Sequence, residues 1–336
     1  MGGFSAHFDF AGEIMKEVTI RSYGKINLSI DITGKMEDGY HRVEMIMHQI
    51  MLHDDVKLCW KPAGVIGRAG DQNKKAGQAV RITVSSDKKD VPSGEDNIAF
   101  KAAALMTKHH GRELSGEVDI FIKKRIPVAA GLAGGSGNAA AVLHGLNVLW
   151  GLSLGTKELC NLGESLGSDV PFSVLGQARS SPAVDGKTRK DPMASSCAFA
   201  YGRGTMLRPV TPLKSFVVIS KPPISIFTGE VYRGMDKRKI EVHPATKELI
   251  SALAEGNHKK MARNMINVLE IYTLSMYDEV VYTKNKMLEF CKDEPVMMSG
   301  SGPAVYALIQ KKNKAEDVYN KMKEYNRETF LTETTL

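Results

Sequence analysis

Residues 127–140 read PVAAGLAGGSGNAA, a stretch with four glycines and one serine. It follows residues 116–124, whose alternating apolar and polar side chains predict a strand. Apolar residues then recur at three- and four-residue steps from Ala139 to Leu149, which predicts an amphipathic helix directly behind the glycines. Glycines let backbone N–H groups approach an anion, and a helix N-terminus attracts negative charge. The stretch therefore predicts a site for phosphate groups, such as those of a triphosphate.

Other interpretations of the glycines fit less well. Gly135, Gly137 and Ala140 satisfy G-x-G-x-x-A, but the dinucleotide fingerprint needs a strand that runs straight into its first glycine, and Pro127 intervenes here. Residues 181–188, SPAVDGKT, lack the leading glycine of a P-loop. A mobile glycine-rich linker is a further alternative, but such linkers are seldom this apolar.

Length and composition limit the class of protein. A chain of 336 residues is long enough for two packed domains, and 43% hydrophobic with 25% charged residues is typical of a soluble globular protein. No apolar run approaches the roughly 18 residues of a membrane span, and the first residues do not resemble a secretory signal. The four cysteines are widely spaced, which favours reduced thiols in the cytoplasm. A net charge of +7 suits a phosphorylated ligand as well as nucleic acid.

The rest of the chain reads as a mixture of strands and helices. Proline and glycine content also marks two polar stretches, 61–79 as a solvated loop or hairpin extension and 180–196 as a surface insertion or interdomain connection. Strands are expected within 18–32, 43–57, 80–85 and 216–220, and helices within 97–109, 157–166 and 245–290, before a final strand, glycine turn, strand and helix.

Three further segments carry residues that could do chemistry. Asp169 stands between a predicted helix and Pro171, and we expect an extended step there to fix the direction of its carboxylate. Lys25 interrupts an otherwise apolar strand, although strand lysines are usually solvated. Residues 38–41, Asp-Gly-Tyr-His, read as a turn whose Tyr40 and His41 could stack on and hydrogen-bond a base, or simply pack on the surface. In isolation each residue is more often structural than functional.

Taken together, the motifs resemble the GHMP kinase superfamily, and within it the kinases that act on a cytidine-diphosphate-linked methylerythritol. The resemblance implies an α+β fold with a ribosomal protein S5 domain 2-like N-terminal domain and a ferredoxin-like C-terminal domain. It also implies ATP-dependent phosphorylation of the 2-hydroxyl of that substrate, a step of non-mevalonate isoprenoid synthesis. The matching motifs are KINL at 25–28, ITGKMEDGYH at 32–41, GEDNIAFKAA at 94–103, IPVAAGLAGGSGNAA at 126–140, GSDVPF at 167–172 and MSGSGPAVYAL at 298–308.

The resemblance also implies roles for individual residues. Asp169 would accept the hydroxyl proton, with Lys25 as its catalytic partner, and Mg²⁺ would accompany ATP. The ATP phosphates would lie along the glycine loop, which we define as Pro127, Val128, Ala129, Ala130, Gly131, Leu132, Ala133, Gly134, Gly135, Ser136 and Gly137. The substrate would contact Asn27, Tyr40, His41 and Tyr232, with the two tyrosines on opposite faces of the cytosine.

We expect a leading tail at residues 1–14, an ATP-binding domain at 15–178 and a substrate domain at 179–336, with the sites in the cleft between the domains. One departure concerns Gly137, where a Ser or Thr is common, so a hydroxyl ligand for Mg²⁺ would have to come from Ser136. Because of this departure, a further alternative is that the protein is an inactive homologue.

Two functional alternatives remain at this point: a GHMP kinase for another small alcohol, such as homoserine or mevalonate, and a non-catalytic RNA-binding protein. We expect a cytoplasmic monomer or weak homodimer that acts on a small molecule, without nucleic-acid or membrane partners.

Overall fold

The computed structural model describes residues 5–8, 14–63, 80–111 and 113–336. Most of the expected loop at 61–79 lies outside these residues, as does most of the expected tail. Contacts divide the chain into two compact units, and each unit is described by itself. Unit 1 comprises residues 1–22, 54–124 and 135–191, and unit 2 comprises residues 23–53, 125–134 and 192–336.

The units are discontinuous in sequence because two strands contribute to both of them. Strands β2 (Ile14–Lys35) and β3 (His41–Pro62) are 22 residues long each, and the division falls within each strand. The expected domains 15–178 and 179–336, in contrast, are continuous segments. The last passage from unit 1 to unit 2 comes after Asp191, within the stretch that we interpreted as a connection.

Unit 1 is built on a sheet in the order β1-β2-β3-β5-β4. Strand β4 pairs with β5 in parallel, and α1 supplies the crossover that a parallel pair requires. Strand β1 pairs antiparallel with β2, so part of the leading segment belongs to the sheet. The other elements of the unit are β1 (Ser5–Phe8), β4 (Arg81–Ser86), the 3₁₀ turn η1 (Gly94–Asp96), α1 (Ile98–His110), β5 (Gly116–Lys123), α2 (Gly134–Leu149), α3 (Thr156–Glu164), α4 (Val170–Ser180) and α5 (Gly186–Arg189).

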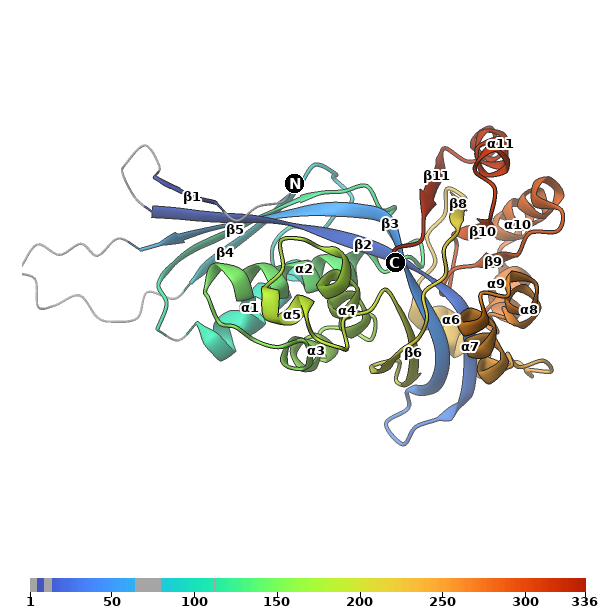
Figure 1. The fold of residues 1–336 in the computed structure, drawn as a ribbon, viewed down its shortest axis with the longest axis horizontal. Coiled ribbons are helices and arrows are strands. Elements are labelled where there is room, and N and C mark those ends of the chain that lie inside the picture. Colours follow the sequence, from blue (N-terminus) through green and yellow to red (C-terminus); the bar gives the residue numbers. More distant parts are fainter. Residues whose placement is uncertain (1–4, 9–13, 64–79, 112) are drawn as a thin grey trace, which may run out of the picture. The chain divides into compact units, whose positions relative to one another are not determined.

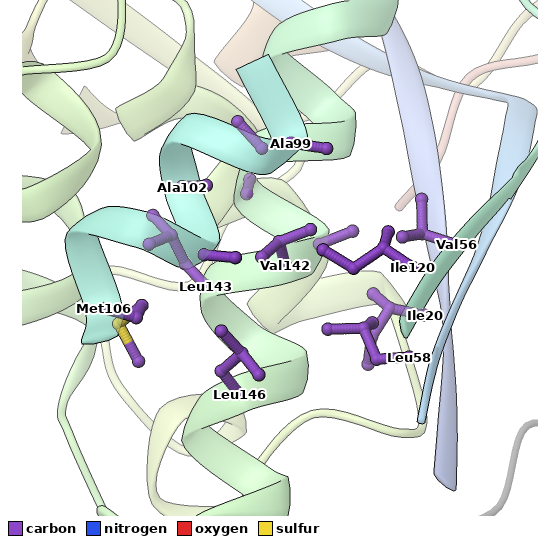
Figure 2. Packing of buried hydrophobic residues seen from close by; sticks show 14 of the residues in the cluster. Ile20, Val56, Leu58, Ala99, Ala102, Met106, Ile120, Val142, Leu143 and Leu146 are labelled. Atoms are coloured by element: carbon purple, nitrogen blue, oxygen red, sulfur yellow. The ribbon is translucent and has the colours of Figure 1, made fainter. Parts of the chain in front are cut away.

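Helices α1 and α2 cover one face of the unit 1 sheet (Figure 1). Strand β5 turns Val118, Ile120 and Ile122 into the core at alternate positions, which confirms the strand predicted from the same alternation. Figure 2 shows apolar residues of α2, such as Leu143, packed between α1 and the strands. This core fixes the position of α2, whose N-terminus is part of the glycine loop.

Unit 2 contains an antiparallel sheet in the order β11-β8-β10-β9. Helices α10 and α11 pack against this sheet (Figure 1). Strand β6 pairs with both β3 and β7. The elements of the unit are β6 (Cys197–Gly202), β7 (Met206–Pro209), β8 (Phe216–Lys221), α6 (Thr228–Met235), α7 (Thr246–Glu255), α8 (His258–Asn264), α9 (Glu270–Met276), α10 (Asp278–Cys291), β9 (Val296–Met298), β10 (Val305–Ile309), α11 (Lys312–Lys323) and β11 (Glu328–Glu333).

One local prediction was wrong. Pro171 does not impose an extended step, because it stands in the first turn of α4, where a helix needs no N–H from it. The stretch 180–196 also contains α5 and buries Val184 and Thr188. In the described part of the chain, no helix has the length and apolar character of a membrane span.

Candidate active site

The glycine loop changes conformation at its midpoint. Helix α2 begins at Gly134, so the second half of the loop is the first turn of the helix rather than a connection before it. In the first half, Ala129, Gly131 and Ala133 have φ values of +50°, +73° and +55°. Positive φ is unusual for alanine, and strained backbone of this kind clusters at functional sites. Alternating left-handed residues turn successive N–H groups toward one side, as in anion-binding nests.

Gly131 packs against the glycine-containing motif at residues 298–308. A Cβ atom added to Gly131 would lie 2.1 Å from the carbonyl oxygen of Ser299, and the Ser299 hydroxyl donates to the Gly131 carbonyl at 3.0 Å. A Cβ atom on Gly300 would in turn lie 3.0 Å from the Gly131 carbonyl oxygen. The backbones of the glycine loop and of the 298–308 motif therefore approach each other closely at these two glycines.

Lys25 is buried beside this junction, with 5% of its surface exposed. Its backbone N–H donates to the Leu132 carbonyl at 3.0 Å, and its ammonium donates to Asn27 Oδ1 at 2.5 Å. A Cβ atom on Gly300 would lie 3.4 Å from Nζ, at contact distance, so Gly300 lies directly beside the ammonium. Unit 2 therefore holds an ammonium group next to the first half of the glycine loop. A buried ammonium is costly to desolvate, which makes a structural surface role a poor explanation for Lys25.

Asn27 is fixed from several sides. Its side-chain amide donates to Met45 Sδ at 3.4 Å, and its backbone carbonyl accepts from the Tyr306 hydroxyl at 2.6 Å. The structure thus brings together Lys25 and Asn27, for which the family resemblance implies roles in catalysis and in substrate binding.

Asp169 belongs to unit 1, whereas Lys25 belongs to unit 2, and each is described within its own unit. Asp169 is half-buried and directly precedes α4. Its carbonyl accepts from the backbone N–H and the hydroxyl of Ser173, at 3.1 and 3.0 Å. The direction of this residue is therefore set by the first turn of a helix.

Gln177 is a residue that the sequence did not single out. It is completely buried on α4, and its amide Nε2 donates to the carbonyl of Gly137 at 2.8 Å. This bond links the helix that follows Asp169 to the helix that begins in the glycine loop. A polar side chain on the buried face of a predicted helix would have drawn attention to Gln177, but α4 was not predicted from the sequence.

The expected substrate residues of unit 2 gather around the start of β3. The rings of His41 and Tyr232 lie 5.2 Å apart, and Tyr40 is 57% exposed. The Arg203 guanidinium lies 4.3 Å from the centre of the Tyr40 ring and pairs with Asp38.

His41 is also held by a residue far away in the sequence. Its Nε2 lies 2.8 Å from Asp236 Oδ1, and Lys35 Nζ lies 2.9 Å from Asp236 Oδ2. Hydrogen bonds from Lys35 and His41 hold the pKa of the Asp236 carboxyl below its usual value. Sequence reasoning missed Arg203 and Asp236, because they lie 165 and 195 residues from their partners Asp38 and His41, and no local pattern marks such a partner.

Ser136 is the residue of the glycine loop that could add a hydroxyl to a bound Mg²⁺. It is half-buried in the first turn of α2. Oxygen atoms are the ligands that Mg²⁺ prefers, and at phosphate sites the ion usually takes most of them from the substrate and from water. Among the described residues, no group of three His, Cys, Asp or Glu side chains has a metal-binding arrangement.

Comparison with known proteins extends over nearly the whole chain. The family model for the GHMP kinases N terminal domain matches residues 97–177, and the GHMP kinases C terminal model matches residues 249–328. The 4-diphosphocytidyl-2-C-methyl-D-erythritol kinase of Alkaliphilus metalliredigens is 40% identical over 321 residues, which cover 95% of this chain and 97% of that protein. The enzyme of the same name from Bacillus licheniformis is 43% identical over 297 residues, or 88% and 89% of the two chains.

A solved structure supports the same relationship. A crystal structure of 4-(cytidine 5'-diphospho)-2C-methyl-D-erythritol kinase matches with a TM-score of 0.70 and 25% identity, covering 95% of this chain and 99% of that chain. The two-domain fold with mixed helices and sheets that the motifs implied is thereby confirmed. Sequence motifs, domain models and fold all agree, and the chain belongs to the GHMP kinase family.

Proposed function

We propose that the protein is an ATP-dependent kinase that phosphorylates the 2-hydroxyl of 4-diphosphocytidyl-2-C-methyl-D-erythritol. Support comes from relatives of that name at about 40% identity over most of the chain. The observation within the structure that carries the proposal is the buried ammonium of Lys25, held by Asn27 beside the first half of the glycine loop.

Phosphoryl transfer depends mainly on positioning and on neutralising charge. The substrate hydroxyl oxygen forms a bond to the γ-phosphorus of ATP, the bond from that phosphorus to the β,γ-bridging oxygen breaks, and ADP leaves. Asp169 takes the hydroxyl proton. The Lys25 ammonium stabilises the negative charge on the transferring group, and the N–H groups of the glycine loop hold the phosphates.

Recognition of the substrate falls to unit 2. Tyr40 and Tyr232 stack on the cytosine, since aromatic stacking on a base contributes about 1 to 3 kcal/mol in nucleic-acid complexes. His41 and Asn27 supply hydrogen bonds. A homoserine or mevalonate kinase would have no base to place against these aromatic rings.

Mg²⁺, when bound with ATP, would neutralise phosphate charge, with Ser136 as the loop hydroxyl that could hold it. We also propose that the protein acts on a small molecule in the cytoplasm, as a monomer or weak homodimer. It would have no nucleic-acid or membrane partners.

The proposal is tested by measuring ADP formation with 4-diphosphocytidyl-2-C-methyl-D-erythritol, mevalonate and homoserine in parallel. We expect turnover with the first compound alone. Asp169→Asn should lower kcat by at least about a hundredfold, the usual contribution of a positioned proton acceptor, because the amide cannot take the proton.

The matched control for Asp169→Asn is Asp185→Asn. Asp185 caps α5 in the same unit by accepting from the Lys187 N–H, and asparagine caps a helix equally well. The control should therefore keep the wild-type rate. Wild-type turnover in the Asp169 variant would overturn the assignment of the base, and turnover of mevalonate or homoserine instead would overturn the assignment of the substrate.

A further inference from the structure

The turn at residues 299–302 lies next to two groups of the candidate site. It belongs to the connection from β9 to β10, and the N–H of its last residue donates to the carbonyl of its first, Ser299, at 2.9 Å. The Ser299 hydroxyl donates to the carbonyl of Gly131 in the glycine loop at 3.0 Å. The next residue, Gly300, lies directly beside the ammonium of Lys25. The position of this turn therefore affects both the glycine loop and Lys25.

One buried side chain, Asn267, holds this turn. Asn267 is 3% exposed and lies shortly before α9. Its Nδ2 donates to the carbonyl of Met298 at 2.9 Å and to the carbonyl of Gly300 at 2.8 Å. Its Oδ1 accepts from the Leu269 N–H at 3.0 Å. Both amide hydrogens thus have an acceptor, and the three bonds together fix the orientation of the amide.

Asn267 is also attached to the strand that carries Lys25. It forms a parallel bridge with Ile30 of β2. The Ile30 N–H donates to the Ile266 carbonyl at 2.9 Å, and the Ile30 carbonyl accepts from the Val268 N–H at 3.0 Å. Asn267 therefore links the backbone of β2 to the turn beside the Lys25 ammonium.

Gly300 depends on this link more than the start of the turn does. Met298 has a second anchor, because its N–H donates to Glu270 Oε1 at 2.8 Å. Within the described ranges, Gly300 makes no hydrogen bond other than the one from Asn267. Without the amide, the buried Gly300 carbonyl would lose its donor, which is unfavourable. We therefore expect the turn to shift until this oxygen reaches water or another donor.

We propose that Asn267 is a positioning residue: by holding Gly300, it makes the 299–302 turn keep the glycine loop and the Lys25 ammonium in the arrangement that phosphoryl transfer requires. The inference rests on the proposed function, because it assumes that ATP phosphates bind at the glycine loop next to Lys25. In this assignment Asn267 acts only through the turn. A displacement of about 1 Å caused far from the reacting atoms can lower a rate about a hundredfold, so a small shift of the turn is enough for a measurable effect.

The first experiment compares the kinetics of Asn267→Ala with those of the wild type. We expect kcat to fall about tenfold or more and KM for ATP to rise, because both depend on the position of the glycine loop. KM for the CDP-linked substrate should stay close to the wild-type value, because His41 and Tyr232 are held by other contacts. Asn267→Ser, whose hydroxyl can satisfy at most one of the two carbonyls, should give a smaller loss and serves if the alanine variant does not fold. A wild-type kcat in either folded variant would overturn the inference.

Asn326→Ala provides the matched control. Asn326 is also a buried asparagine of unit 2, 7% exposed. Its Nδ2 also donates two hydrogen bonds, to Ser220 Oγ and to Thr283 Oγ1 at 3.0 Å each, but these partners lie on β8 and α10. The control should lower the free energy of unfolding to a similar extent and keep the wild-type kcat. An equal loss of kcat in the two alanine variants would attribute the effect to instability and overturn the inference.

A second measurement needs neither turnover nor a ligand. NMR of protein labelled with nitrogen-15 glycine reports on the amide of Gly131 in the glycine loop. We expect this signal to shift in Asn267→Ala, because the turn no longer holds the loop, and to keep its position in Asn326→Ala. The amide of Gly256, which follows α7, should be unchanged in both variants.

The NMR result also separates the inference from the proposed function. An unchanged Gly131 signal in a folded Asn267 variant would overturn the inference. A wild type without kinase activity, whose Gly131 signal nevertheless depends on Asn267, would reject the proposed function and keep the link from Asn267 to the glycine loop.

Discussion

Gly131 occupies a position where no side chain fits. Its φ is +73°, and an added Cβ atom would lie 2.1 Å from the Ser299 carbonyl oxygen. The left-handed backbone alone costs an L-residue about 1 to 2 kcal/mol, and the collision can be relieved only by moving backbone. We expect Gly131→Ala to lower the free energy of unfolding by more than about 2 kcal/mol and to raise KM for ATP, because the glycine loop must shift. Urea unfolding and steady-state kinetics measure the two effects.

Gly256→Ala separates the collision from the backbone cost. Gly256 also has a positive φ, +64°, in the same unit, but an added Cβ atom would meet nothing within 4 Å. This variant should lose about 1 kcal/mol and keep the wild-type KM for ATP. Equal losses in the two variants would show that the contact with Ser299 is unimportant.

At the scale of elements, the spacing between α2 and α4 depends on one side chain. Gln177 donates from Nε2 to the Gly137 carbonyl, while its Oε1 is buried without a partner in the described part of the chain. Leucine has a similar size and would remove the buried Oε1 that lacks a partner, which favours stability, while the Gly137 carbonyl would lose its donor from Gln177, which opposes it. We expect Gln177→Leu to change the free energy of unfolding by less than about 1 kcal/mol and to lower kcat about tenfold, because Asp169 loses its fixed position relative to the glycine loop.

Gln49→Leu is the contrasting variant for this prediction. Gln49 is buried in unit 2 and accepts from the Thr335 hydroxyl at 2.9 Å. Its replacement should lower stability, because a buried hydroxyl loses its acceptor, without lowering kcat. If Gln177→Leu loses stability but keeps its rate, the link between the helices is structural only.

The elements that the sequence predicted well are those with a strong local pattern. Strand β5 alternates through Ile120, and α2 repeats its apolar residues at helical spacing, so both were found. Helix α4 was missed because Pro171 indicates a helix end, although it is equally compatible with a first turn.

In the candidate site, too, the sequence predicted only those residues that belong to a local motif. Lys25 and Asn27 lie two residues apart on one strand, and the motif that contains them is visible in the sequence. Asp236 meets His41 only after the strands and α6 have packed, so this partner depends on tertiary structure and carries no local signal.

At the scale of the whole molecule, each unit contains one fully buried histidine among the residues whose burial the structure describes. In unit 2, the backbone N–H of Leu213 donates to Nε2 of His48 at 2.8 Å, so this nitrogen must be unprotonated, and Nδ1 lies 2.8 Å from the Gln49 carbonyl oxygen. In unit 1, Nε2 of His144 lies 3.0 Å from the Val174 carbonyl oxygen. Burial lowers the pKa of both imidazoles from 6.5 to about 4.

These pKa values predict loss of stability in acid. Between pH 6.5 and about 4 the unfolded chain binds protons that the folded chain excludes, so the stabilisation is complete above pH 6.5 and is lost as the pH falls toward 4. A pKa lowered by more than two units corresponds to about 3 kcal/mol for each histidine. Urea unfolding between pH 8 and pH 4.5 measures the slope, which should flatten in His144→Leu because one titrating group is gone. His109→Gln, which replaces an exposed histidine of α1, should keep the wild-type slope. A wild-type slope in His144→Leu would mean that the acid sensitivity arises elsewhere in the molecule.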